Sequence, residues 1–242
     1  MEEFFIGLLQ NILAGVLILA AGVVVAWLAG ARSRWRIIAA VLRLKRNGVS
    51  NIFLNRSEYV SRRPISVDQY IDLTRREFIY VGIYFSIATD QSRVDETIRA
   101  LLQRRCKFTI VLLDPETTAE SIRFLEEYFA LGAGTLRNRI RHAIQHFRAL
   151  RDSLAPDTRS LLDIRLHELP VTSSAFLRDP RDGDGSMLVD IKWCGMGRER
   201  SFGLEFVGTS VDGSLFDTVR NSFEASLNSQ HHLSRPSARR FV

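Results

Sequence analysis

The chain has 242 residues, of which 46% are hydrophobic and 25% are charged, so it can bury a substantial core and is not intrinsically disordered. Its formal net charge is +6, and most of the positive charge comes from arginine. The cysteines, Cys106 and Cys194, have no metal-ligand spacing and form no disulfide framework, which excludes a small disulfide-stabilised secreted domain and favours a reducing compartment.

Residues 4–31 form an uncharged, strongly apolar segment. A helix needs only about 20 such residues to cross the hydrocarbon core of a bilayer. The chain begins with the acidic residues Glu2 and Glu3, whereas a cleaved signal peptide begins with basic ones. We therefore expect a transmembrane helix within residues 1–31, with Trp27 as an interfacial anchor.

Basic residues follow this segment at once: Arg32, Arg34, Arg36, Arg43, Lys45 and Arg46. The positive-inside rule then predicts a single-pass protein of the inner membrane, with its N-terminus outside and the rest of the chain in the cytoplasm. Residues 32–47 continue as a basic helix that also carries apolar side chains, and Asn47-Gly48 predicts its end. We favour a helix that lies along the anionic membrane surface; the alternative is the first helix of the soluble domain.

Apolar strands and amphipathic helices alternate in the next part of the chain. Strands are predicted at 49–54, 78–86 and 107–114, and helices at 66–76, 92–105, 117–130 and 135–154. The segment from Ser66 to Gln69 is a capping box that opens the first of these helices. Buried strands separated by helices are typical of a parallel sheet covered by helices.

The last third of the chain changes to a strand period. Strands are expected at 161–169, 172–179, 186–195 and 201–208, followed by an amphipathic helix at 214–227. The sequence therefore predicts one α/β domain at residues 48–228, with an antiparallel extension at one edge of its sheet. Residues 229–242 are expected to form a loose polar tail.

The segment VTSSAFLRD has an informative spacing, Thr172-x-Ser174-x-x-x-x-Asp179. It resembles the H-x-K-x-x-x-x-D signature of the phospholipase D superfamily. The segments NGVSNIFLNRSEY, IYVGIYFS, LLQRRCKFTIVLLDPE and SLFDTVRNSFEASL also follow the layout of a single phospholipase D-like half, over roughly residues 47–228. The resemblance implies a phospholipase D-like fold. It also implies a non-catalytic half, because threonine and serine replace the histidine and the lysine.

The chemistry of these positions argues against hydrolysis. In the family, the histidine takes the phosphoryl group, the lysine neutralises the phosphate oxygens and the acid orients the histidine. Neither Thr172 nor Ser174 can do this work, and we expect His167 to be a packed histidine. The chain has no phosphate-binding glycine loop and no serine-hydrolase motif. We therefore expect no enzyme activity, no cofactor and no metal.

Ligands of open α/β sheets bind beyond the carboxyl ends of the strands. The candidate ligand-binding residues, expected to converge there, are Asn55, Arg56, Ser86, Thr89, Asp114, Thr172, Ser174 and Asp179. Together they offer hydroxyls, an amide, a guanidinium and carboxylates, enough to hold a nucleotide or another phosphate ester. The alternative for several of them is a local turn or cap; Asp114, for example, precedes Pro115.

Three functions remain open. The leading hypothesis is a membrane-anchored cytoplasmic sensor–effector that binds a nucleotide-type signal and forms a homo-oligomer. Its clustered helices, with small residues such as Gly15 and Gly22, would then perturb or permeabilise the lipid bilayer, as in bacterial antiviral defence or stress response. The alternatives are a divergent membrane-bound phosphodiesterase and a membrane-tethered scaffold that docks a partner protein.

Overall fold

The structure is a computed structural model that describes residues 35–53, 66–85, 91–192, 194, 202–228 and 231–232. The chain divides into two compact units, Met1–Lys45 and Arg46–Val242. Among the described residues, no helix is both long enough and apolar enough to span a bilayer. The predicted transmembrane segment lies outside the described residues and stays a prediction.

Residues 35–46 form a helix, as predicted for 32–47. Its large apolar side chains are exposed, with Trp35 at 69% and Leu42 at 62%. After the helix, Gly48 has φ +91°, a left-handed conformation that favours glycine. A Cβ at this position would lie 2.7 Å from the carbonyl oxygen of Val207, so the close approach of this backbone also requires glycine.

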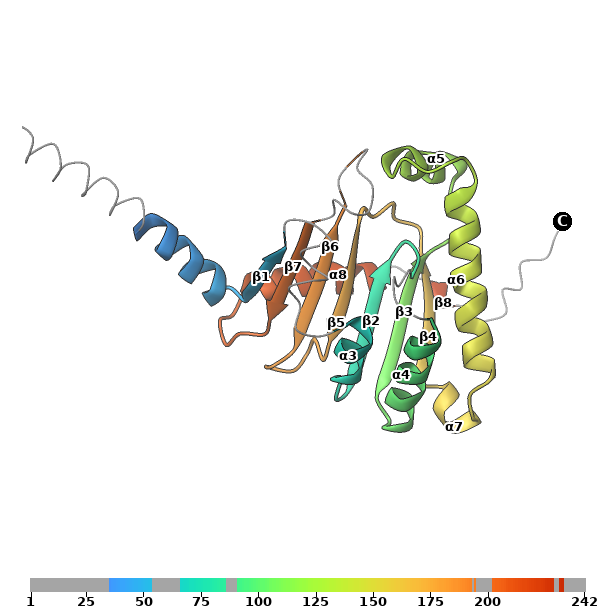
Figure 1. Cartoon of the computed structure of the whole chain (residues 1–242), viewed down its shortest axis with the longest axis horizontal. Coiled ribbons are helices and arrows are strands. Elements are labelled where there is room, and N and C mark those ends of the chain that lie inside the picture. The colour runs from blue at the N-terminus through green and yellow to red at the C-terminus, as the bar shows by residue number, and fades with distance from the viewer. Residues whose placement is uncertain are drawn as a thin grey trace, which may run out of the picture. The chain divides into compact units, whose positions relative to one another are not determined.

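The unit Arg46–Val242 is built on a mixed sheet, with eight strands among the described residues in the order β1-β7-β6-β5-β2-β3-β4-β8 (Figure 1). The strands are β1 (Val49–Phe53), β2 (Glu77–Gly82), β3 (Lys107–Leu113), β4 (Leu162–His167), β5 (Ser173–Arg178), β6 (Ser186–Ile191), β7 (Phe202–Val207) and β8 (His231–His232). Strands β2, β3 and β4 are parallel, and the other pairs are antiparallel. The α/β class and the antiparallel extension are confirmed.

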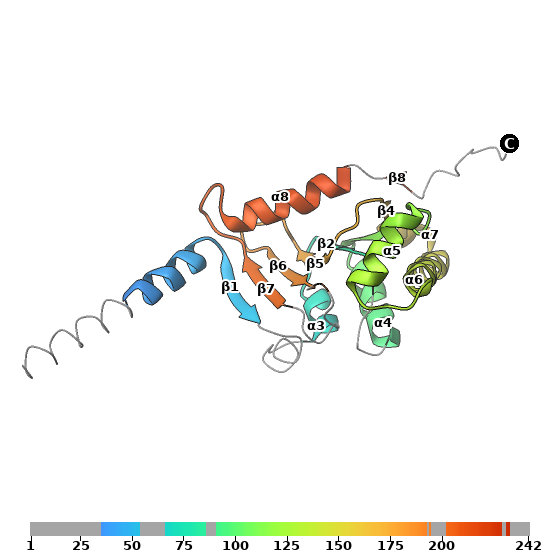
Figure 2. The same cartoon turned by 90° about the horizontal axis from the view of Figure 1, so that it is seen from above.

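Helices cover both faces of this sheet. They are α3 (Val67–Asp72), α4 (Gln91–Gln103), α5 (Ala119–Tyr128), α6 (Thr135–Asp152), α7 (Pro156–Arg159) and α8 (Leu215–Asn228). Figure 2 shows α8 on one side of the sheet, and α3, α4 and α6 on the other. The fold therefore has three layers: the sheet lies between α8 on one face and the other helices on the opposite face.

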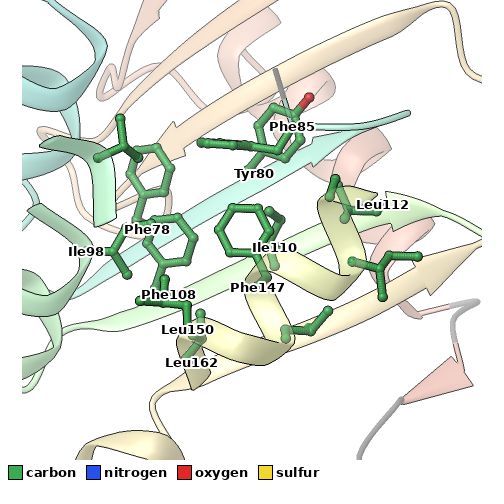
Figure 3. Close-up of a cluster of buried hydrophobic side chains, with 14 of the residues drawn as sticks. Phe78, Tyr80, Phe85, Ile98, Phe108, Ile110, Leu112, Phe147, Leu150 and Leu162 are labelled. Atoms are coloured by element: carbon green, nitrogen blue, oxygen red, sulfur yellow. The ribbon is translucent and has the colours of Figure 1, made fainter. Parts of the chain in front are cut away.

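Successive side chains of a strand point to opposite faces of the sheet and so fill the hydrophobic cores on both faces. In β2, Phe78 and Tyr80 join the larger core cluster beneath α4 and α6, whereas Ile79 and Val81 join the smaller cluster beneath α8. The larger cluster is rich in rings: Phe78 stacks on Phe108 with centroids 5.2 Å apart (Figure 3). Burial on both faces explains why the sequence of β2 is apolar at every position after its first residue.

Several predicted boundaries were wrong for identifiable reasons. The helix predicted at 66–76 begins as expected, with the Ser66 N–H donating to Gln69 Oε1 at 2.8 Å, but it ends at Asp72. Strand 78–86 ends at Gly82. Strand β1 was expected in the parallel part, yet it pairs antiparallel with β7. The tail was expected to be loose, but its short strand β8 pairs with β4.

The larger core cluster yields a test of packing. Phe147 is buried on α6, where its ring packs edge-on against Phe85 with centroids 5.2 Å apart. Phe147→Ala should lower the free energy of unfolding by about 3–5 kcal/mol, because it leaves a cavity among rings. Phe124 of α5, half-exposed, is the matched control, and Phe124→Ala should cost less than about 1 kcal/mol. Denaturant unfolding measures both; equal losses would contradict the packing.

Candidate functional site

The carboxyl ends of the parallel strands form one edge of the sheet. Strand β5 runs antiparallel to β2 and therefore begins at this edge, with Ala175 opposite Val81. Ser174 pairs with Asp190 of β6, and a Cβ on Gly82 would lie 3.0 Å from the Cβ of Ser174. We call this the carboxyl edge. Thr172, Ser174 and Asp114 come to it, as predicted.

Four predicted ligand residues cannot be placed. They are Asn55, Arg56, Ser86 and Thr89, which lie outside the described residues. The strands that precede them, β1 and β2, both end at the carboxyl edge, since Phe53 is opposite Gly203 and Gly203 is opposite Asp190. Their role as ligand contacts stays a prediction.

Asp114 supports the turn between β3 and α5. Its Oδ1 accepts the N–H of Glu116 at 2.8 Å, and its carbonyl oxygen accepts the N–H of Thr117 at 3.1 Å. Its own N–H donates to the carbonyl of His167 at 2.7 Å. Asp114 therefore forms the turn that the sequence offered as the alternative to ligand binding. The turn uses one of its two carboxylate oxygens.

His167 is packed beneath the carboxyl edge, at 3% exposure. Its Nε2 lies 3.2 Å from the carbonyl oxygen of Gly82, which can only accept, so Nε2 carries the proton. Burial lowers the pKa of His167 below 6.5, although the hydrogen bond to Gly82 acts in the other direction. The imidazole is therefore neutral, closed to solvent and used to join β4 to β2, as expected of a packed histidine.

Asp179 lies at the opposite edge from the other motif positions. Arg178 pairs with Phe78 at the start of β2, so the residue after it reaches the amino end of the parallel strands. The expected convergence of Thr172, Ser174 and Asp179 was wrong. Strand geometry gives the reason: at about 3.4 Å per residue, five residues of extended chain separate Ser174 from Asp179 by about 17 Å.

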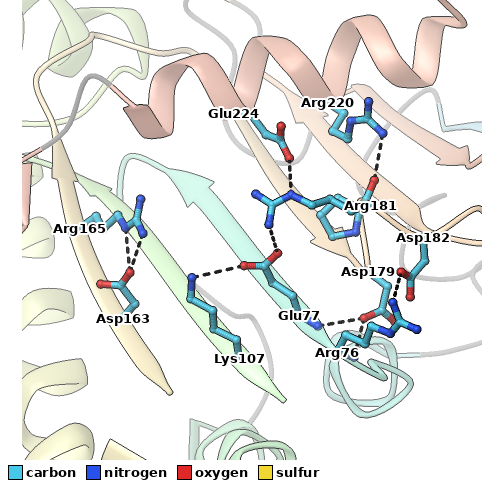
Figure 4. A network of polar contacts seen from close by, with 11 residues as sticks. Arg76, Glu77, Lys107, Asp163, Arg165, Asp179, Arg181, Asp182, Arg220 and Glu224 are labelled. Atoms are coloured by element: carbon cyan, nitrogen blue, oxygen red, sulfur yellow. Dashed lines mark hydrogen bonds and ion pairs between the residues drawn. The ribbon is translucent and has the colours of Figure 1, made fainter. Parts of the chain in front are cut away.

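The buried carboxylate of Asp179 binds backbone. It accepts N–H bonds from Arg75 at 2.9 Å, from Arg76 at 2.8 Å and from Glu77 at 3.0 Å. Its own N–H donates to the Glu77 carbonyl at 2.8 Å, and its φ is +46°. Arg76 also pairs with Asp182 at 3.1 Å (Figure 4). The acid of the motif therefore anchors the β5–β6 loop to the start of β2, and it contacts no histidine in the part of the chain that the structure describes.

Two cations at the carboxyl edge were absent from the predicted site. The guanidinium of Arg139, on α6, donates to the hydroxyl of Tyr84 at 3.1 Å, just beyond β2. Lys192 follows β6, with its Nζ 5.6 Å from the ring centroid of Phe129. The hydroxyl of Tyr128 donates to the Lys192 carbonyl at 2.8 Å, which joins the end of α5 to the end of β6. For Arg139, the run of arginines on the predicted helix 135–154 was the available signal; no sequence pattern marks Lys192.

Comparison with known proteins assigns no family. No protein-family model and no curated relative matches the chain. Among solved structures, the chain is similar to Nuc, a phospholipase D family member from Salmonella typhimurium, with 10% identity, 69% of this chain and 87% of that chain covered, and a TM-score of 0.41. It is also similar to the archaeal chromatin protein TrmBL2, which has a novel mode of DNA binding (10% identity, 84% and 62% covered, TM-score 0.43).

A third similar structure is the phosphatidylserine synthase of Haemophilus influenzae Rd KW20, with 14% identity, 70% of this chain and 36% of that chain covered, and a TM-score of 0.39. At such identities and TM-scores, the similarities assign neither a family nor an activity to the chain.

The anchoring role of Asp179 predicts a stability defect. Asp179→Asn keeps one carbonyl oxygen but turns an amide N–H₂ toward a backbone donor, which leaves at least one N–H of residues 75–77 unpaired. The free energy of unfolding should fall by about 2–4 kcal/mol. Asp184→Asn is the control, because the ion pair of Asp184 with Arg75 is exposed and should contribute less than about 0.5 kcal/mol. Similar values for both variants in denaturant unfolding would refute the anchor.

The buried neutral His167 predicts a pH dependence. As the pH falls below 6.5, the unfolded chain takes up a proton on this histidine, whereas the folded protein takes it up only at lower pH. The free energy of unfolding therefore decreases as the pH falls below 6.5, by up to about 1.4 kcal/mol per pH unit. His167→Gln can keep a donor to Gly82 but cannot titrate. Its free energy of unfolding should change less than that of the wild type between about pH 7.5 and about pH 5.5. An identical change in both proteins would contradict this assignment.

Proposed function

We propose that the protein is a membrane-anchored cytoplasmic sensor–effector. Its α/β domain, a degenerate phospholipase D-like half, binds a nucleotide-type signal at the carboxyl edge. The apolar segment 4–31 crosses the inner membrane and self-associates, and the clustered helices then perturb or permeabilise the bilayer. Bacterial antiviral defence or stress response is the setting that fits this design.

The proposal rests on one observation: hydroxyl side chains stand at the motif positions, and the nearby histidine is packed. Thr172 and Ser174 occupy the positions where phosphoryl transfer needs a histidine and a lysine. A nucleophilic histidine must turn a nitrogen toward phosphorus, yet both ring nitrogens of His167 are buried beneath this edge, Nε2 against the Gly82 carbonyl and Nδ1 within the protein. Such an edge recognises a phosphate ester and releases it unchanged.

The cations at the same edge support a phosphate-bearing ligand. Arg139 offers a planar fork of donors beside the Tyr84 ring, with its Cζ 5.8 Å from the ring centroid. Lys192 supplies a compact ammonium at the end of β6. Charge-assisted bonds from such groups are about twice as strong as neutral ones, and aromatic rings nearby can pack against a base.

The membrane half of the proposal rests on the chain before the domain. The basic residues after segment 4–31 favour a cytoplasmic domain. The helix 35–46 exposes Trp35, Ile38 and Leu42 on one face, a surface suited to the bilayer interface. Because one span alone cannot enclose a pore, membrane perturbation requires several copies.

A thermal-shift screen tests recognition. Full-length protein in detergent should gain about 2.7 kcal/mol of stability from a nucleotide present at 100 times its dissociation constant. Thr172→Val and Lys192→Met should weaken this binding about tenfold, by removing a hydroxyl and an ammonium. Thr97→Val, on the exposed side of α4, is the control and should bind as the wild type does. If no nucleotide shifts the transition, the scaffold hypothesis replaces this one.

Membrane potential tests the effector step. Expression of the full chain together with its signal should depolarise the inner membrane. Gly15→Leu with Gly22→Leu should reduce the depolarisation, because close helix contacts need small residues. Ala14→Leu is a control for added bulk at one position. Unchanged potential and viability with the wild-type chain would remove the effector role while leaving nucleotide binding open.

A further inference from the structure

Helix α6 is strongly basic on its exposed surface. Its 18 residues include five arginines, no lysine and a single acid, Asp152. Its apolar side chains are buried in the larger core cluster, so the arginines lie on the remaining surface of the helix. Figure 1 and Figure 2 place α6 at the opposite end of the domain from β1.

Four of the arginines follow one flank of the helix. At about 100° per residue they fall within an arc of about 80°, and at about 1.5 Å per residue they extend over about 21 Å. The fifth, Arg139, lies on the opposite flank, where it bonds Tyr84 at the carboxyl edge. The flank is therefore separate from the ligand site proposed above. We call its four residues the arginine row: Arg137, Arg141, Arg148 and Arg151.

The arginine row keeps most of its positive charge. Among the described residues, Arg141 is the one member that forms an ion pair, with the exposed Glu116 at 2.8 Å. The hydrogen bond from Arg141 lowers the pKa of Glu116, and the positive charge of Arg137 acts in the same direction. Asp152, the acid of α6 itself, forms no ion pair in the described part of the chain. One paired carboxylate thus serves four guanidinium groups.

The chemistry of the row suits phosphodiester groups. Each guanidinium presents a planar fork of donors that can bind two phosphate oxygens at once, whereas a lysine ammonium acts as a point charge. Phosphates follow one another about every 3.4 Å along each strand of a duplex. A row of four forks over about 21 Å can therefore contact several phosphates of one strand.

The surroundings of the row favour a duplex over a lipid surface or a single strand. Helices at a bilayer interface expose large apolar side chains beside their cations, as Trp35 does on the helix 35–46, but α6 exposes none. Single-strand sites add aromatic rings on which bases stack, and the ring of α6, Phe147, is buried. The bases of a duplex are already stacked, so cations alone can hold its backbone.

We propose that the arginine row binds the phosphate backbone of a nucleic-acid duplex without reading its sequence. The duplex lies along the flank of α6 that points away from Tyr84. With four phosphate contacts, the logarithm of the association constant should fall with the logarithm of salt concentration with a slope of about −3.6 for DNA. Binding should then weaken about 150-fold between about 50 mM and about 200 mM salt.

Fluorescence anisotropy tests the proposal with the full-length protein in neutral detergent and short labelled duplexes. DNA and RNA duplexes of unrelated sequence should bind in low salt with dissociation constants below about 100 µM, and their ratio shows which backbone is preferred. A single strand should bind more weakly, because its charge density is lower. Tighter binding of the single strand, a strong dependence on sequence, or no binding of any duplex would overturn the proposal. Absence of duplex binding would leave nucleotide binding at the carboxyl edge untouched.

A double variant locates the binding. Arg137→Gln with Arg148→Gln removes two cations that have no ion pair, so the salt slope should decrease by about two and binding in low salt should weaken about tenfold or more. The matched control, Arg104→Gln with Arg123→Gln, removes the same charge from exposed arginines outside α6 and should keep the slope. Equal losses would mean that net charge, and not the row, holds the duplex. Thr172→Val should bind duplexes as the wild type does, which separates the row from the carboxyl edge.

Two further measurements close the test. Vesicles of phosphatidylglycerol, mixed with the protein in neutral-lipid nanodiscs and separated by flotation, examine the lipid alternative. Vesicle binding that requires the row, without duplex binding, would assign the row to lipid and contradict the proposal. Circular dichroism checks the fold of each variant. If the double variant does not fold, Arg148→Gln alone, at an exposed side chain, should reduce the salt slope by about one.

Discussion

One buried carboxylate fastens the antiparallel half of the sheet to the parallel half. Asp179 accepts the N–H groups of Arg75, Arg76 and Glu77, three consecutive residues that turn the chain from α3 into β2. Buried backbone donors without partners are costly, and this carboxylate satisfies a whole turn of them. It therefore sets where α3 ends and where β5 ends. The resulting register of β5 on β2 brings Ser174 beside Gly82 at the far edge.

This constraint changes how the motif spacing is understood. Its first two positions lie at the carboxyl edge, and its acid lies at the amino edge, where it does structural work. Asp179 thus affects the carboxyl edge only indirectly, through strand β5, which joins it to Ser174. As far as the structure describes it, the carboxyl edge presents the hydroxyls of Thr172 and Ser174, the carboxylate of Asp114, two cations and a packed histidine. We propose that these groups hold a phosphate ester without cleaving it.

Local patterns predicted much of the fold. The apolar stripe of α6 and the continuous apolar runs of β2 and β3 identified helices, strands and the parallel arrangement. Long-range pairing was not available from such patterns: β1 looks like any strand before a helix, yet its partner β7 lies about 150 residues away. The site was predicted only in part, because its geometry also depends on long-range strand pairing. Thr172, Ser174 and Asp114 follow from strand ends, whereas Asp179 was misplaced because the direction of β5 was not weighed.

Following the chemical fate of a bound phosphodiester tests the central claim most directly. Full-length protein in detergent would be mixed in excess with a linear dinucleotide and observed by phosphorus NMR over many hours. The account predicts a resonance that shifts on binding and returns unchanged when the dinucleotide is displaced, with no phosphomonoester at any time. Phosphomonoester that accumulates in proportion to protein, and that disappears in a folded His167→Gln variant, would contradict it.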